Sequence, residues 1–127
     1  MNLPLATLLS DDSPENVLKL VNSLGIDDET PVVVYDDTFG ALASRVAWTL
    51  EWIGHFDVTL LETTYSNWKS LGLETDSLTP EISNKEHSMN LQSNILATSE
   101  YLESVKSRDD VILIDNRERL NYLEQHI

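Results

Sequence analysis

The run Val32-Val33-Val34-Tyr35-Asp36 decides the fold, because β-branched and aromatic residues follow one another without a break until an aspartate ends them. A short, continuous apolar run of this kind predicts a strand covered on both faces, as in a parallel sheet. A helix is predicted before it over residues 13–25, since Ser13 can cap the first turn and Pro14 suits its first position.

Helices and strands continue to alternate after this run. A polar loop leads into a predicted helix over residues 41–53, which Gly54 ends. Residues 57–61 are predicted to form the next strand, and residues 63–71 a short helix. This order, with short connections, predicts an α/β fold with a parallel sheet and helices on both faces.

The pattern dissolves over residues 73–94, which carry Pro80, few large apolar residues and many Ser, Asn and Glu. We interpret this segment as a linker or surface arm. Order returns with a helix capped by Thr98, a third strand over residues 111–115 and a helix over residues 117–125.

Length and charge narrow the class of protein. The chain has 127 residues and 14.4 kDa, the size of one domain, with 22 acidic against 8 basic residues and a formal net charge of −14. Such a charge disfavours nucleic acid and anionic membrane surfaces as partners. No apolar run approaches the roughly 18 residues of a membrane helix, and no signal peptide is recognisable. We therefore expect a cytoplasmic protein.

The chain contains no cysteine. This excludes disulfides, thiolate metal sites and a cysteine nucleophile within the chain. The three histidines, His55, His87 and His126, have no metal-ligand spacing, and we expect structural roles for them. Neither a metal nor another cofactor is predicted.

Carboxylates at the ends of predicted strands are the candidate chemistry. Asp36, Asp37 and Asp115 lie where open α/β sheets place ligands, and such carboxylates could hold Mg²⁺ for phosphoryl transfer. If residues 111–115 join the same sheet as residues 32–36, Asp115 ends near Asp36, and the two carboxylates should raise one another's pKa. The alternative, which we favour, is that these aspartates only cap helices and turns.

Two stretches resemble the rhodanese (sulfurtransferase) family. The longer one resembles the non-catalytic first half of two-domain thiosulfate and 3-mercaptopyruvate sulfurtransferases; its matching segments are residues 24–26, 32–36, 43–48, 52–55 and 57–61, with Trp68 and Gly72. The second, Val111 to Glu118 with Tyr122 and His126-Ile127, resembles the opening of a rhodanese domain, D-x-R-E…Y…H-I. Arg45, Asp115 and Arg117 are the family-motif residues.

The resemblance implies a parallel-sheet rhodanese fold and assigns the family's persulfide cysteine to the position of Asp36. A carboxylate cannot accept sulfane sulfur, so the resemblance implies no catalytic residue here. Instead it implies a vestigial active-site loop, made of Asp36, Asp37, Thr38, Phe39, Gly40 and Ala41.

The order of segments leaves the domain organisation open. Residues 1–72 resemble a rhodanese core segment, residues 73–94 a linker or surface arm, and residues 95–127 the start of a rhodanese domain. Either the chain is a piece of a tandem sulfurtransferase, with a catalytic rhodanese domain of the same longer protein as partner, or residues 111–115 complete one circularly permuted domain in the same sheet as residues 32–36. The competing functions are an acidic protein-interaction module and a metal or phosphoryl site built on the three aspartates.

Overall fold

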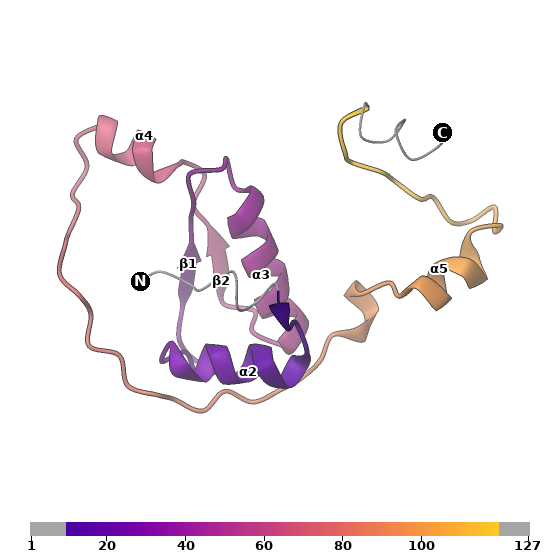
Figure 1. Ribbon diagram of the computed structural model, residues 1–127, viewed down its shortest axis with the longest axis horizontal. Coiled ribbons are helices and arrows are strands. Elements are labelled where there is room, and N and C mark those ends of the chain that lie inside the picture. The colour runs from indigo at the N-terminus through magenta and orange to yellow at the C-terminus, as the bar shows by residue number, and fades with distance from the viewer. Residues whose placement is uncertain (1–9, 120–127) are drawn as a thin grey trace. The chain divides into compact units, whose positions relative to one another are not determined.

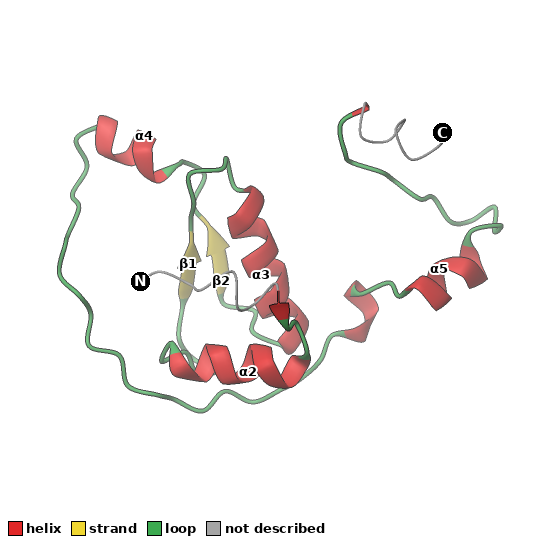
Figure 2. Cartoon of the chain, viewed as in Figure 1, coloured by secondary structure: helices red, strands yellow, loops and turns green. Residues whose placement is uncertain are grey.

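The computed structural model of the chain describes residues 10–119. The chain divides into two compact units, Met1–Ile95 and Leu96–Ile127. Most of the regular structure belongs to the first unit (Figures 1 and 2).

The first unit has the predicted α/β order around a parallel pair of strands. Strand β1 (Val32–Val34) pairs in parallel with strand β2 (Val58–Leu60), with Val32 opposite Val58 and Val34 opposite Leu60. The predicted elements of this unit are present, with ends shifted by a few residues. In chain order they are α2 (Pro14–Ser23), β1 (Val32–Val34), α3 (Ala41–Ile53), β2 (Val58–Leu60) and α4 (Tyr65–Ser70). A 3₁₀ turn that was not predicted, η1 (Ser93–Ile95), follows them.

Local signals in the sequence set the helix ends. The Ser13 hydroxyl accepts a hydrogen bond from the Asn16 N–H at 3.4 Å, and Pro14 occupies the first turn of α2. Gly54 ends α3 with a φ of +100°, a left-handed conformation that suits glycine. The caps predicted for these helices are therefore the ones that form.

The hydrophobic core lies between α2, α3 and one face of the sheet. Val17 and Val21 of α2 meet Leu50 and Ile53 of α3, and all four are buried. From the sheet, β1 and β2 contribute partly buried valines, and α3 packs against both strands. This arrangement fixes α3, and with it the loop that precedes α3.

The other face of the sheet is open, which corrects the prediction that the strand at residues 32–35 is covered on both sides. Val33 is 60% exposed and Tyr35 is 50% exposed. Only the border of this face is lined by helix α4, whose Tyr65 ring lies 6.0 Å from the Tyr35 ring. A parallel strand needs a second covering layer to be buried on both faces, and the described residues supply a full layer on one side only.

Residues 82–92, called the strap below, have no helix or strand but are tied to the C-terminal ends of two helices. The Lys85 N–H donates to the Asn22 carbonyl of α2 at 3.1 Å. The N–H groups of Asn90 and Gln92 donate to carbonyls of α3, those of Ile53 and Trp52, at 2.9 and 2.8 Å. The strap therefore satisfies carbonyls that helix ends leave free.

The second unit contains α5 (Ser99–Val105), capped by the Thr98 hydroxyl as predicted. The strand predicted at residues 111–115 is wrong for the described structure. These residues form no strand, and Ile112 and Ile114 are 84% and 85% exposed. A strand requires a hydrogen-bonding neighbour, and the sheet in residues 10–119 has two strands. The helix predicted at 117–125 lies mostly outside the described residues.

None of the helices in residues 10–119 is long and apolar enough to cross a membrane.

Candidate functional site

The loop after β1 folds around the carboxylate of Asp36. Oxygen Oδ1 accepts the N–H groups of Thr38 and Gly40 at 2.9 and 2.8 Å. Oxygen Oδ2 accepts the N–H groups of Leu42 and Ala43, both at 2.9 Å. The Thr38 hydroxyl also donates to Oδ2, at 2.7 Å. Four backbone N–H groups and one hydroxyl thus surround a single anion.

Backbone conformation and the start of α3 produce this convergence. Phe39 and Gly40 have φ values of +55° and +86°, so the chain turns and its N–H groups face inward. The N-cap of α3 is Gly40, which has no side chain to accept the first N–H groups of the helix. Asp36 accepts them instead, at the positive end of the helix dipole. We call residues 36–43 the anion cradle.

The cradle stabilises the charged form of Asp36. The Thr38 hydroxyl has the largest effect and, together with the N–H groups of Ala43, Gly40 and Thr38, holds the pKa of the Asp36 carboxyl well below its usual range; desolvation, the next-largest effect after the hydroxyl, opposes this shift. The site is therefore a preformed anion-binding loop that the chain's own carboxylate occupies.

Comparisons with known proteins identify the family of this loop and its scaffold. The sequence profile of the family described as Rhodanese-like domain matches residues 2–71, more than half of the chain. The chain belongs to the rhodanese-like family.

Named relatives point to the same enzymes that the sequence resembles. A probable 3-mercaptopyruvate sulfurtransferase of Pseudomonas aeruginosa is 43% identical over 63 residues, which cover 49% of this chain and 22% of that protein. The thiosulfate sulfurtransferases of Bos taurus and Cricetulus griseus are each 37% identical over 109 residues, covering 81% of this chain and 35% of those proteins. This rhodanese-like chain thus spans about a third or less of the length of these relatives.

Asp37, the next residue of the predicted loop, turns away from the cradle toward α4. Its carboxylate accepts the Ser66 N–H at 2.8 Å and the Ser66 hydroxyl at 3.1 Å. The Asp36 carbonyl accepts the Tyr65 N–H at 3.2 Å. The two adjacent aspartates therefore bind different elements: the Asp36 carboxylate accepts N–H groups of its own loop and of α3, and the Asp37 carboxylate accepts the N–H and hydroxyl of Ser66 in α4.

The other predicted loop residues are on the surface. Phe39 is 95% exposed, and Ala41 is exposed as well. Arg45, a family-motif residue on α3, lies 3.4 Å from the Asp12 carboxylate, and its guanidinium lies 5.1 Å from the centre of the Trp48 ring. None of these three side chains donates to the Asp36 carboxylate.

In the second unit, the family-motif residues Asp115 and Arg117 form an ion pair. The guanidinium and N–H of Arg117 lower the pKa of Asp115 to about 2. The sequence-based expectation that Asp36 and Asp115 have raised pKa values is wrong. Each carboxylate is bound by its own donors, and these lower the pKa of both.

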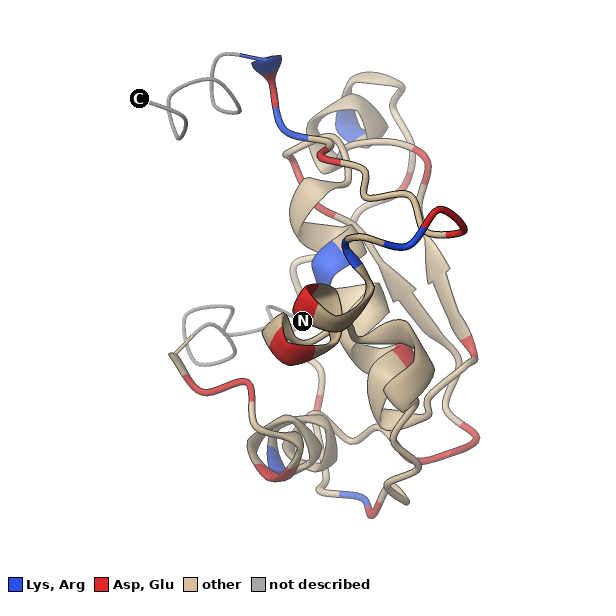
Figure 3. Cartoon of the chain, turned by 90° about the vertical axis from the view of Figure 1, so that its right-hand side faces the viewer, with Lys and Arg blue, Asp and Glu red and all other residues tan. Residues whose placement is uncertain are grey.

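No group of three metal-ligating side chains gathers anywhere in residues 10–119. Figure 3 shows acidic residues spread along the chain. The carboxylates of Asp36 and Asp37 are already bound by N–H and hydroxyl donors, so a metal ion would have to displace those donors. These carboxylates serve loop and helix geometry.

Two buried histidines form a pair that the sequence did not reveal. Nδ1 of His55 and Nε2 of His87 are 3.0 Å apart, although the residues are 32 positions apart in the chain. A short, local motif could not indicate this contact, because the strap brings His87 back to the end of α3.

Proposed function

We propose that this chain is a rhodanese-family segment that does not transfer sulfur itself and forms a structural or regulatory part of a tandem sulfurtransferase. The observation that carries the proposal is the Asp36 carboxylate bound by four N–H groups of the cradle. The family resemblance puts the persulfide cysteine at this position. A loop suited to hold an anionic sulfur here holds a carboxylate.

The chemistry of sulfur transfer supports this proposal. Transfer from thiosulfate requires a thiolate that attacks the sulfane sulfur while sulfite leaves. A carboxylate does not perform this attack, its charge repels thiosulfate, and the chain has no cysteine elsewhere. The first unit keeps the parallel strands and helices of the family without the nucleophile.

The length of the match to thiosulfate sulfurtransferases supports the tandem arrangement. The family profile ends at residue 71, but the Bos taurus match covers 81% of 127 residues, about 103 residues. A stretch of that length reaches into α5. We therefore propose that residues 95–127 belong to a second rhodanese domain, in preference to a permuted single domain. The cytoplasmic location predicted from the sequence stays a prediction.

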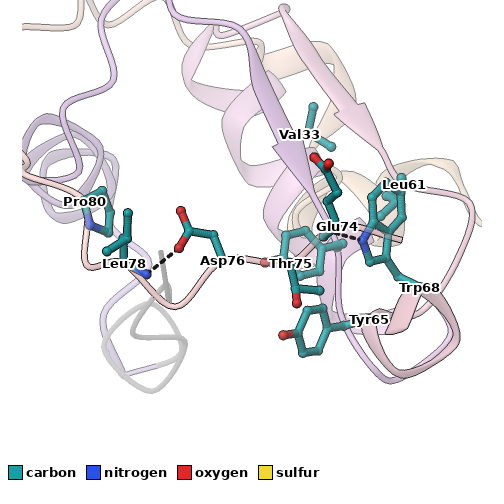
Figure 4. Close-up of a pocket in the computed structure, with 10 residues that line it drawn as sticks. Val33, Leu61, Tyr65, Trp68, Glu74, Thr75, Asp76, Leu78 and Pro80 are labelled. Atoms are coloured by element: carbon teal, nitrogen blue, oxygen red, sulfur yellow. Dashed lines mark hydrogen bonds between the residues drawn. The ribbon is translucent and has the colours of Figure 1, made fainter. Parts of the chain in front are cut away.

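The open face of the sheet is the surface we assign to the partner. It borders a pocket of about 510 Å³, lined by Val33 of β1, by Tyr35 and Leu61 just after the two strands, by Tyr65 and Trp68 of α4, and by residues of the segment 74–80 (Figure 4). Exposed apolar patches of this kind mark interaction sites. Because the match covers only 22% and 35% of two of these relatives, which are more than twice as long as this chain, we propose that the cysteine-bearing rhodanese domain of the same longer protein covers this face.

An assay of sulfur transfer tests the first half of the proposal. The purified chain should produce no thiocyanate from thiosulfate and cyanide above the rate without protein, because it has no thiol to hold the persulfide. A cysteine-bearing thiosulfate sulfurtransferase is the positive control. Turnover by the cysteine-free chain would contradict the proposal.

A binding experiment tests the second half. The chain should bind the separately expressed cysteine-bearing half of a matching thiosulfate sulfurtransferase, and Val33→Asp should weaken this binding about tenfold or more, because it buries a charge in an apolar contact. Phe56→Asp is the matched control, since Phe56 is 64% exposed but does not line the pocket. Equal effects of the two substitutions, or no binding at all, would count against this partner.

A further inference from the structure

The proposed function makes no use of the buried pair His55 and His87. The two residues are 1% and 5% exposed, and they are two of the three buried polar residues among those described. Their rings are 5.1 Å apart between centres, with Nδ1 of His55 and Nε2 of His87 at 3.0 Å. Two titratable rings in direct contact inside a core require an explanation.

Hydrogen-bond partners fix where the protons lie in the neutral pair. Nδ1 of His87 faces the carbonyl of Ser88 at 2.5 Å, and a carbonyl only accepts, so this nitrogen carries a proton. Nε2 of His87 is then an acceptor, and Nδ1 of His55 donates to it. This leaves Nε2 of His55 without a proton, and this buried atom has no hydrogen-bond partner among the described residues.

An added proton has no suitable place in this arrangement. The 3.0 Å contact between the rings needs one N–H donor and one nitrogen acceptor. With Nδ1 of His87 already protonated, the third N–H of a singly charged pair must therefore be on Nε2 of His55, whichever ring takes up the proton. That atom is buried and faces no acceptor in the described residues. A buried charge without a partner is costly, and two charged rings cannot keep the contact.

The charged groups around the pair come from the turn after α2 and from the strap. The Asp28 carboxylate lies 3.6 Å from Nδ1 of His87, but it already accepts the Ser88 hydroxyl at 2.6 Å. Asp27 pairs with Lys85 at 2.8 Å. From α2, the neutral amide oxygen of Asn22 accepts the His87 N–H, and His55 follows the C-terminal end of α3, whose dipole favours a cation.

These carboxylates do not titrate near neutral pH. Hydrogen bonding by Lys85 lowers the pKa of Asp27 to about 2, and the Ser88 hydroxyl lowers the pKa of Asp28. Histidine is the side-chain type whose ordinary charge change falls between pH 5.5 and 7.5, and the two imidazoles are the histidines at this contact among residues 10–119.

His87 is also the point at which the strap enters the core. It is the only buried residue of residues 82–92. Before it in the chain, Lys85 donates to Asn22; after it, Ser88 donates to Asp28 and Asn90 donates to Ile53. Removing the His87 ring from the core would therefore release those bonds together.

We propose that the neutral His55–His87 pair is a pH-sensitive latch, which holds the strap against the ends of α2 and α3 and releases it when the pair takes up a proton. The strap closes at pH 7.5 and opens in mildly acidic solution. Opening hydrates both rings, exposes the carbonyls of Ile53 and Trp52, and uncovers the C-terminal end of α3.

Linkage sets the size of the expected effect. A histidine in water has a pKa of about 6.5. For each ring that gains its proton only when the strap is open, the equilibrium constant for opening rises about tenfold as the pH falls from 7.5 to 5.5. Two such rings would give about a hundredfold.

Hydrogen exchange of the full chain measures this effect directly. After correction for the intrinsic rates, the strap amides of Lys85, His87, Asn90 and Gln92 should lose at least about tenfold in protection from pH 7.5 to 5.5. The Leu61 amide, which donates to the Val34 carbonyl within the sheet, is the internal reference and should keep its protection. A strap response no larger than that of Leu61 overturns the proposal.

Variants separate the latch from other acid effects. The double substitution His55→Phe and His87→Phe keeps two buried rings that cannot titrate, and it should remove the pH response of the strap. His126→Gln, which changes the remaining histidine, should leave the response intact. A pH response that survives in the double variant contradicts the latch.

Ring titrations of the wild-type chain give a second readout that does not depend on the variants folding. In NMR spectra of the wild-type chain with labelled histidines, the rings of His55 and His87 should gain charge over the same pH range in which the strap amides lose protection. Rings that become charged while the strap stays protected would overturn the proposal.

Discussion

Asp36 is a carboxylate in a place built for an anion, and its surroundings explain both its loop and its chemistry. Its two oxygens satisfy N–H groups from the turn and from the first turn of α3, whose N-cap glycine has no side chain. The sequence predicted this loop and its aspartate through the family resemblance. It could not predict the five donors, because their convergence depends on the positive φ values at Phe39 and Gly40.

Asp36→Asn should destabilise the protein at pH 7. The amide keeps one acceptor oxygen but places an NH₂ group against donors, so two or three hydrogen bonds are lost. We expect the Tm to fall by about 4–8 °C, the size of a lost helix cap in a domain of this length. A Tm measured by circular dichroism that stays at the wild-type value would show that the cradle does not depend on the charge.

The pH dependence of the same variant follows from the lowered pKa of Asp36. A carboxyl with a lowered pKa in the folded state stabilises the fold above its unfolded pKa of about 3.9, and this stabilisation is lost as the pH falls through the folded value. The stability difference between wild type and Asp36→Asn should therefore be constant from pH 7 to about 5 and shrink below pH 4. A difference that grows on acidification contradicts this assignment.

At the scale of elements, α4 is held by a side chain from another loop. Asp37 binds both the N–H and the hydroxyl of Ser66 in the first turn of this six-residue helix. The sequence predicted a short helix over residues 63–71 but did not indicate the contact between Asp37 and Ser66, since the two residues are 29 positions apart.

Asp37→Ala should loosen α4 while the rest of the first unit keeps its structure. Amide exchange in α4 should accelerate by about fivefold to tenfold, corresponding to the loss of one capping interaction. Asp57→Ala is the control, because the Asp57 side chain makes no hydrogen bond or ion pair within residues 10–119 that α4 could lose. If both variants accelerate α4 equally, Asp37 is not its anchor.

The strap and α3 meet at Gly54. A Cβ at this position would lie 2.7 Å from the Asn90 carbonyl oxygen, and the φ of +100° is itself unfavourable for an L residue. We expect Gly54→Ala to cost about 2–4 kcal/mol in the free energy of unfolding. Gly72→Ala serves as the matched control, because Gly72 has a φ of +69° with nothing within 4 Å of the added Cβ. Denaturant unfolding should show a larger loss at Gly54, and equal losses would exclude a close strap.

Elements with a local signature were predictable, and elements that need a distant partner were not. The capped helices and the two β-branched runs of the first unit follow from residues 13–71 alone. The run at residues 111–115 has an equally strong strand composition, yet without a paired neighbour it stays extended and exposed. The strap has no pattern at all, and its position follows from single polar contacts such as the His55–His87 pair.

For the whole molecule, the described structure is a rhodanese-like unit with one covered and one open sheet face, followed by a second unit. Ile53 and Leu50 pack on the covered face, whereas Val33 on the other face is 60% exposed. The family is evident from sequence because its motifs are linear. The proposed loss of sulfur transfer rests on Asp36, whose carboxylate accepts four backbone N–H groups of its loop.

We propose that residues 36–43 form an anion cradle in which Asp36 stands at the position of a sulfur nucleophile. The most direct measurement is the thiol pKa of the Asp36→Cys variant, taken from the pH dependence of its alkylation rate. Because the chain has no other cysteine, the new thiol is the only one that reacts. We expect the pKa of this thiol to lie at least one unit below the ordinary value of about 8.5, since the cradle's N–H groups and the start of α3 stabilise the thiolate. A thiol pKa at or above about 8.5 would contradict it.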